Sequence, residues 1–202
     1  MKQAEVTETM RKMVKDRILS SIQAKQALLA DTVFQGMVAA VAMRIADSLR
    51  AGGKLFLFGN GGSASDAEHI AAEFTGRYLK ERRGLPAIAL NVNLSALTAI
   101  GNDYGFDAIF ARQMEALGRA GDVAIGISTS GNSRNVIRGL EVAKSMQLFT
   151  VALTGESGGK VKNIAECTIQ IRSQETPRIQ ECHILTGHII CELVENAMFE
   201  DT

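Results

Sequence analysis

The first fifty residues place apolar side chains at the spacing of amphipathic helices. Val6, Met10, Val14, Ile18 and Ile22 recur every fourth position, which predicts a helix over residues 2–29. A second helix is expected to begin at the N-cap Asp31 and to end at Gly52-Gly53. Its apolar side consists of Phe34, Met37, Val38, Val41, Ile45 and Leu49. The first helix is far in sequence from any strand, which favours an interface between subunits. The alternative is that both helices cover the sheet of their own chain.

After residue 53 the pattern changes to short, continuously apolar runs separated by helical patterns. The runs predict strands at 54–58, 87–90, 123–127, 149–153 and 168–171, and the helical patterns cover 65–79, 106–118, 133–146 and 178–198. Apolar strands that alternate with helices are typical of a parallel sheet covered on both faces. We therefore expect one doubly wound α/β domain over residues 1–202, with a five-stranded parallel sheet and residues 1–51 as a two-helix N-terminal extension.

Composition and charge narrow the possible partners. The chain is 46% hydrophobic, and its 22 basic and 22 acidic residues leave no net charge. This balance argues against a general electrostatic grip on nucleic acid or on an anionic membrane, so neither partner is expected. The polar N-terminus has no apolar signal region, and no apolar run approaches the ~18 residues of a membrane span. Three cysteines without CxxC spacing suit a reducing compartment, so a cytoplasmic location is expected.

Two loops that follow predicted strands are suited to binding a phosphate. One runs from Gly59 to Ser65 (GNGGSAS) and the other from Ser128 to Ser133 (STSGNS). Glycines let the backbone approach a ligand, and the helix that follows presents free N–H groups to an anion. Neither loop has the lysine of a nucleoside triphosphate site, so a single phosphate monoester is the better ligand. The alternative is that both are ordinary turns with capping serines.

Acid–base chemistry is concentrated on two predicted helices. Ser65 and Glu68 form a capping-box pattern that predicts the start of the first of these helices, where His69 and Glu73 share one face. The last helix carries RIQECH and then His188, and the wheel position of its other histidine, His183, favours a structural role.

These motifs together resemble the sugar isomerase (SIS) family of phosphoheptose isomerases. The resemblance rests on GNGGS with Asp66, His69 and Glu73, on the TGRY that follows, on Gly101-Asn102-Asp103, on ISTSGNS, and on RIQE with His183 and His188. It covers the chain from about residue 30 to the end. It implies a flavodoxin-like SIS fold and an isomerase that converts sedoheptulose 7-phosphate into D-glycero-D-manno-heptose 7-phosphate. That reaction is the first step toward the ADP-heptose of lipopolysaccharide core and other surface glycans.

The resemblance also implies the roles of individual residues. Glu73 and His188 match the catalytic acid–base pair, and His69, Glu73, Gln180 and His188 match a metal-associated set for Zn²⁺. The implied substrate-binding residues are Asn60, Gly61, Gly62, Ser63, Glu73, Asn102, Asp103, Ser128, Thr129, Ser130, Ser133 and Gln180. The family implies a homotetramer with active sites at subunit interfaces. Gln180 and His188 are eight residues apart, ~12 Å along a helix, so they converge on one ion only with extended side chains or with ligands from another subunit.

One position departs from the family, and two other functions fit the same motifs. Asn93 stands where several members have an acidic residue, which puts a carboxylate role there in doubt. A replication regulator that binds the initiator DnaA shares the loops and the RIQE helix, but lacks the residues that match Glu73 and His188. The other alternative is an isomerase or binding protein for a different sugar phosphate.

Overall fold

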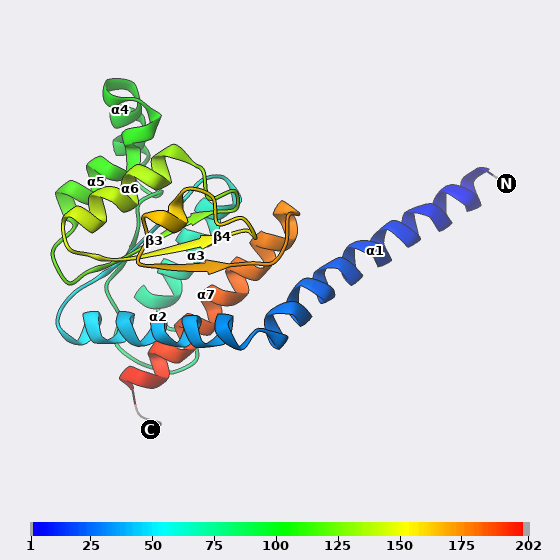
Figure 1. Ribbon diagram of the computed structural model, residues 1–202, viewed down its shortest axis with the longest axis horizontal. Helices are drawn as coiled ribbons and strands as arrows, with labels where there is room; N and C mark the ends of the chain where they lie inside the picture. The colour runs from blue at the N-terminus through cyan, green and yellow to red at the C-terminus, as the bar shows by residue number, and fades with distance from the viewer. Residues whose placement is uncertain (1, 200–202) are drawn as a thin grey trace.

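The computed structural model describes residues 2–199, with side chains from residue 6, and it has a parallel β-sheet at its centre (Figure 1). The strands are β1 (Leu55–Gly59), β2 (Ala87–Ala89), β3 (Val123–Ser128), β4 (Phe149–Thr154) and β5 (Cys167–Gln170). They lie in the order β2-β1-β3-β4-β5, and every neighbouring pair is parallel. This order confirms the predicted doubly wound, flavodoxin-like sheet.

Alternate side chains of each strand enter two separate hydrophobic cores. Leu55 and Leu57 of β1 pack toward α2 (Thr32–Arg50), α3 (Gly62–Thr75) and α7 (Thr176–Met198). Phe56 and Phe58 pack on the opposite face, toward α5 (Ile109–Leu117) and α6 (Arg134–Ser145). Since both faces of the strands are buried, continuous apolar runs are the expected sequence pattern. Because helices pack on both faces of the sheet, the loops at the carboxyl ends of its strands have fixed positions, and a ligand site can form there.

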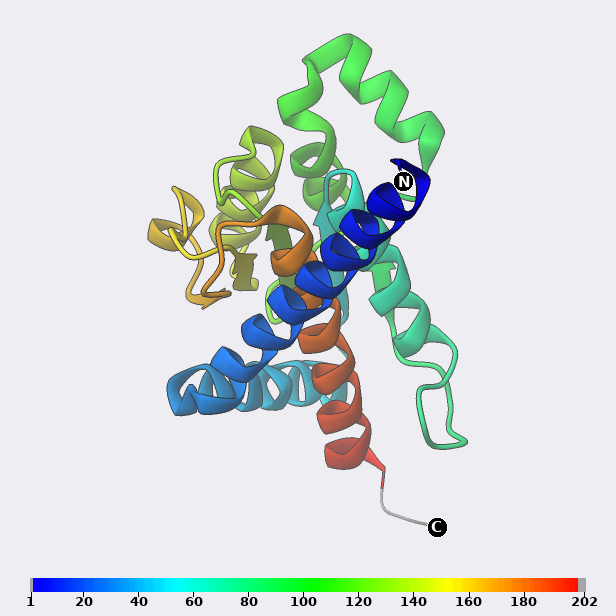
Figure 2. The same ribbon diagram turned by 90° about the vertical axis from the view of Figure 1, so that its right-hand side faces the viewer.

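The N-terminal extension has one packed helix and one projecting helix. Asp31 accepts hydrogen bonds from the N–H groups of Val33 and Phe34, which confirms it as the N-cap of α2. The preceding helix, α1 (Lys2–Ala30), extends away from the sheet (Figures 1 and 2). Its large apolar side chains from Val6 to Ile22 are exposed, among them Val14 at 60% and Ile18 at 56%, whereas Leu28 near its end is buried. Among the described residues, no single helix is long and apolar enough to cross a membrane; α1 and α2 meet that test only jointly, and they bend by 77° where they meet.

The structure corrects three of the predicted boundaries. α3 begins at Gly62 rather than at residue 65, so Ser65 lies within the helix and the capping-box prediction is wrong. α3 also ends at Thr75, and residues 76–79 belong to an irregular segment. Helix α4 (Leu94–Tyr104) was not predicted, and none of its residues is buried. The described residues also include two short 3₁₀ turns, η1 (Phe106–Ala108) and η2 (Val161–Asn163). The helix predicted at 106–118 therefore begins as the turn η1, and its α-helical part, α5, starts at Ile109.

Candidate active site

The glycine loop and the serine loop lie next to each other at the carboxyl edge of the sheet. They follow β1 and β3, which pair directly with Gly59 opposite Ile127. This pair is where the strand order reverses, the position at which open α/β sheets bind ligands. The side chains of Asn60 and Asn135 exchange two hydrogen bonds of 2.8 Å and so connect the first loop to α6. Asn135 was not among the predicted site residues, because nothing in the sequence marks a partner 75 residues away.

The serine loop gathers three hydroxyl groups. The Oγ of Ser128, which is buried, lies 3.0 Å from that of Ser133 and 3.5 Å from that of Ser130. Gly131 turns the chain at φ +65°, and a side chain there would collide with the backbone of Gly158, so this position requires glycine. Ser133 is the N-cap of α6 and makes no capping hydrogen bond of its own, which leaves its hydroxyl to the cluster. Hydroxyl groups at a helix N-terminus suit a phosphate monoester.

An open pocket of about 460 Å³ adjoins the serine loop at Ser130. Its lining includes Thr129 and Ser130 of the serine loop and also Glu156 and Gln174. Its volume falls within the range of about 300–1,000 Å³ that is usual for small-molecule sites. The predicted residue Thr129 is half-buried here, whereas Ser130 is exposed.

The glycine loop starts α3 in contact with α7. Gly61 has φ +56° and is the N-cap of α3, and Ser63 is buried. The amide of Gln180 lies so close to Gly62 that a Cβ at Gly62 would be 2.3 Å from its Nε2 atom. The loop glycine therefore makes room for Gln180.

Farther along the same two helices, His69, Glu73 and His188 form a cluster. Gly187 allows the close approach, since a Cβ there would be 2.4 Å from the Cδ1 atom of Ile70. The Nε2 atom of His69 lies 3.1 Å from a Glu73 carboxylate oxygen and 3.2 Å from the Nε2 atom of His188. The structure thus brings together a carboxylate and two imidazoles, one possible base and two groups able to donate a proton.

The donor atoms of this cluster fit a zinc ion. One ligand atom from each of the three residues lies within 4.8 Å of the others. Two imidazole nitrogens at about 2.0–2.1 Å from a tetrahedral zinc are about 3.3 Å apart, close to the spacing of the two Nε2 atoms here. Gln180, eight residues before His188, lies against Gly62 at the other end of α3. Its predicted place in a metal set remains a prediction.

Two neighbouring ionisable groups have displaced pKa values. His183 is fully buried and bonds through Nε2 to the carbonyl oxygen of Thr154 at 3.1 Å, in agreement with a structural role. Burial lowers the pKa of His183 to about 4, although the bond to Thr154 opposes the change. Burial raises the pKa of Asp66 on α3 to about 6, against the charge of His69.

Asn102 and Asp103 lie apart from the cluster within one chain. Both are exposed on α4, which packs on α5 and η1 and stands at the upper end of the molecule in Figure 1. The amide of Asn102 donates to the Asp103 carboxylate at 2.8 Å. Asn93 is the N-cap of α4 and accepts from the N–H of Ala96 at 3.0 Å, which gives this departure from the family a local structural role.

Comparison with known proteins identifies the family of this chain. The family model of the SIS domain matches residues 6–155. The chain is 62% identical over 160 residues to the phosphoheptose isomerase of Aquifex aeolicus, covering 79% of this chain and 84% of the relative. It is 50% identical over 188 residues to that of Aneurinibacillus thermoaerophilus, covering 93% and 95%. The structure of phosphoheptose isomerase from Neisseria gonorrhoeae is similar with a TM-score of 0.86 and 44% identity, over 93% of this chain and 99% of that one. The chain belongs to the SIS domain family and, within it, to the phosphoheptose isomerases.

Proposed function

We propose that the chain is an aldose–ketose isomerase that converts sedoheptulose 7-phosphate into D-glycero-D-manno-heptose 7-phosphate. The observation that carries the proposal is the cluster in which the Glu73 carboxylate and the His188 imidazole lie around one point, with His69 between them. Relatives named phosphoheptose isomerase at 50–62% identity support the same reaction.

The reaction needs one proton moved between adjacent carbons. A base removes the proton from C1 of the ketose, an enediolate forms, and a proton is returned to C2 while the oxygens exchange theirs. We assign the carbon-bound proton to Glu73 and the oxygen protons to His188. Glu73 and His188 therefore act on C1 and C2, at the opposite end of the substrate from its phosphate.

The phosphate is assigned to the serine loop. The hydroxyls of Ser128, Ser130 and Ser133 converge there, and the N-terminus of α6 adds a favourable dipole. Binding energy from this distant end is available to position the reacting carbons.

Zinc is proposed as a cofactor held by His69, Glu73 and His188. When bound, it supplies Lewis-acid stabilisation of the charge that develops on the substrate oxygens. Gln180 is a further candidate ligand by family resemblance. Metal analysis of the purified protein tests this proposal, and a metal content near zero with full activity contradicts it.

A tetramer with shared active sites is proposed from two exposed surfaces. α1 carries unburied apolar side chains along much of its length, and α4 presents Asn102 and Asp103 away from the cluster of its own chain. A second subunit that covers these surfaces would complete the site. The proposed cellular role is the first step toward ADP-heptose for surface glycans, in the cytoplasm.

The second candidate function is that of the replication regulator that binds DnaA. The presence of both Glu73 and His188 argues against this function. An assay with sedoheptulose 7-phosphate and with sedoheptulose decides between the functions. We expect turnover of the phosphate ester and very poor turnover of the free sugar. Equal rates for both sugars would contradict the phosphate assignment, and no turnover of either would contradict the enzyme.

A further inference from the structure

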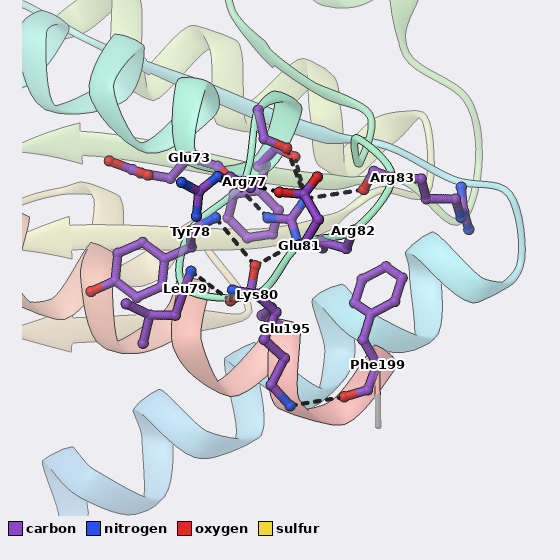
Figure 3. A network of polar contacts seen from close by, with 12 residues as sticks. Glu73, Arg77, Tyr78, Leu79, Lys80, Glu81, Arg82, Arg83, Glu195 and Phe199 are labelled. Carbon is purple, nitrogen blue, oxygen red and sulfur yellow. Dashed lines mark hydrogen bonds and ion pairs between the residues drawn. The ribbon is translucent and has the colours of Figure 1, made fainter. Parts of the chain in front are cut away.

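A buried ion pair joins α7 to the irregular segment that follows α3. Arg82 and Glu195 have side chains that are 2% and 1% exposed, and the Nε of Arg82 lies 2.6 Å from a Glu195 oxygen (Figure 3). A buried ion pair is costly unless its remaining hydrogen-bonding groups also have partners. Here both side chains form further hydrogen bonds to the backbone. The pair therefore links the backbone around the end of α3 to α7.

Glu195 organises the backbone of the segment. Its carboxylate accepts the N–H groups of Tyr78, Leu79 and Lys80 at 3.2, 2.7 and 2.9 Å (Figure 3). Three successive backbone donors on one carboxylate fix the course of the chain at that point, since a buried N–H without a partner is unfavourable. The position of Tyr78 is thus set by α7.

Arg82 acts on the other end of the same unit. Its guanidinium donates to the carbonyl oxygens of Glu73 and Phe74 at 2.9 and 3.0 Å, and to that of Gly76 at 3.2 Å. These carbonyls end α3, where the helix leaves acceptors unpaired and favours a positive charge. The same ion pair therefore holds the last turn of α3, which carries Glu73.

Tyr78 in turn contacts His188. The two rings are stacked, with centroids 5.8 Å apart and an interplanar angle of 23°. His188 also meets His69 edge to face, with ring centroids 5.1 Å apart. The imidazole of His188 therefore contacts two rings, one from α3 and one from the segment that Glu195 anchors.

We propose that Tyr78 is a positioning residue for His188, and that the Arg82–Glu195 pair holds Tyr78 and the Glu73 end of α3 in register with α7. Glu195 lies seven residues after His188, two helical turns, and hence on the same side of α7. One face of α7 thus presents the catalytic imidazole and also anchors the ring that orients it. The kinetic part of this proposal rests on the proposed isomerase function.

The test compares Tyr78→Leu with Tyr78→Phe, which keeps the ring and serves as the matched control. Catalytic geometry that shifts by about 1 Å costs up to about 10²-fold in rate. For Tyr78→Leu we expect kcat for sedoheptulose 7-phosphate to fall about 10- to 100-fold with KM within about three-fold. We expect Tyr78→Phe to stay within about two-fold of the wild type. Glu195→Gln is expected to lower kcat in the same way, and Glu141→Gln, which removes an exposed carboxylate on α6, is the control for it.

An NMR measurement on the same proteins separates positioning from general stability and from the assigned reaction. With ¹³C-labelled histidine and one metal state throughout, loss of the Tyr78 ring is expected to weaken the NOEs between the His188 and His69 rings, whose Nε2 atoms lie 3.2 Å apart, and to leave the signals of buried His183 unchanged. Unchanged NOEs between His188 and His69 in Tyr78→Leu, or equal losses of kcat in the Leu and Phe variants, would overturn the proposal. If the wild type does not isomerise the substrate, the proposed function fails, and the NOEs between His188 and His69 still decide the positioning role. If Glu195→Gln does not fold, the Tyr78 pair decides alone.

Discussion

Replacing the buried His183 with glutamine removes one titrating group and is expected to change how stability depends on pH. In the folded chain, burial lowers the pKa of His183 to about 4, against a usual value of 6.5. The imidazole projects from the buried side of α7 and donates a hydrogen bond to the carbonyl oxygen of Thr154. Glutamine keeps a donor for that carbonyl but takes up no proton in this range.

The direction of the change in the free energy of unfolding depends on which state, folded or unfolded, binds the proton of His183 more tightly. Between pH 6.5 and about 4, the unfolded chain protonates His183 and the folded chain does not, so the free energy of unfolding falls as the pH falls. The two pKa values correspond to a loss of about 3 kcal/mol in full, and of about 2 kcal/mol between pH 7.5 and 5. Asp66 acts in the opposite sense, since its raised pKa of about 6 makes the folded chain the stronger proton binder. The difference between wild type and variant isolates the histidine.

Urea unfolding of both metal-free proteins from pH 7.5 to 4.5 measures this difference. We expect the wild type to lose about 2 kcal/mol more than His183→Gln by pH 5, whatever the variant's stability at neutral pH. Parallel profiles for the two proteins would refute the reasoning, because they would mean that His183 titrates alike in the folded and unfolded chains.

Three further predictions concern packing, substrate binding and assembly. Gly187→Ala is expected to cost about 1–3 kcal/mol in urea unfolding through its collision with Ile70, and Ile70→Val in the same chain should recover part of it; no recovery would contradict the contact. Ser128→Ala is expected to raise KM for the sugar phosphate about ten-fold and to change kcat less, by steady-state kinetics, because it removes one hydrogen bond worth about 1 kcal/mol or more. Val14→Asp with Ile18→Asp is expected to yield smaller assemblies by light scattering with lost activity, whereas a fully active monomer would refute a shared site.

The central sheet could be predicted from the sequence because its signal is local. Five apolar runs marked the strands, and Asp31 marked the start of α2, since each depends on neighbours in the chain. α4 was missed; none of its residues is buried, and it packs on α5 and η1 through contacts that the local pattern does not show. The start of α3 was misplaced because the Ser65–Glu68 pattern resembles a cap, whereas the N-cap is Gly61 at φ +56° and the helix begins at Gly62.

The candidate site was predictable only as far as its motifs reach. The spacing of His69 and Glu73 placed them on one face, and the resemblance to the family added His188. Nothing local in the sequence indicates that Asn135 bonds to Asn60, or that Glu195 binds the backbone at residues 78–80. Those contacts join parts of the chain 75 and more than 100 residues apart, and only the fold brings them together.

Turnover of sedoheptulose 7-phosphate by the wild type and by Glu73→Gln, measured side by side, tests the acid–base assignment most directly. Glutamine preserves the size of the side chain and removes its ability to take the C1 proton. We expect the wild type to form the aldoheptose phosphate and the variant to lose about 10²–10⁴ in kcat, the range for a general base. Near-native turnover by Glu73→Gln, or none by the wild type, would contradict the account.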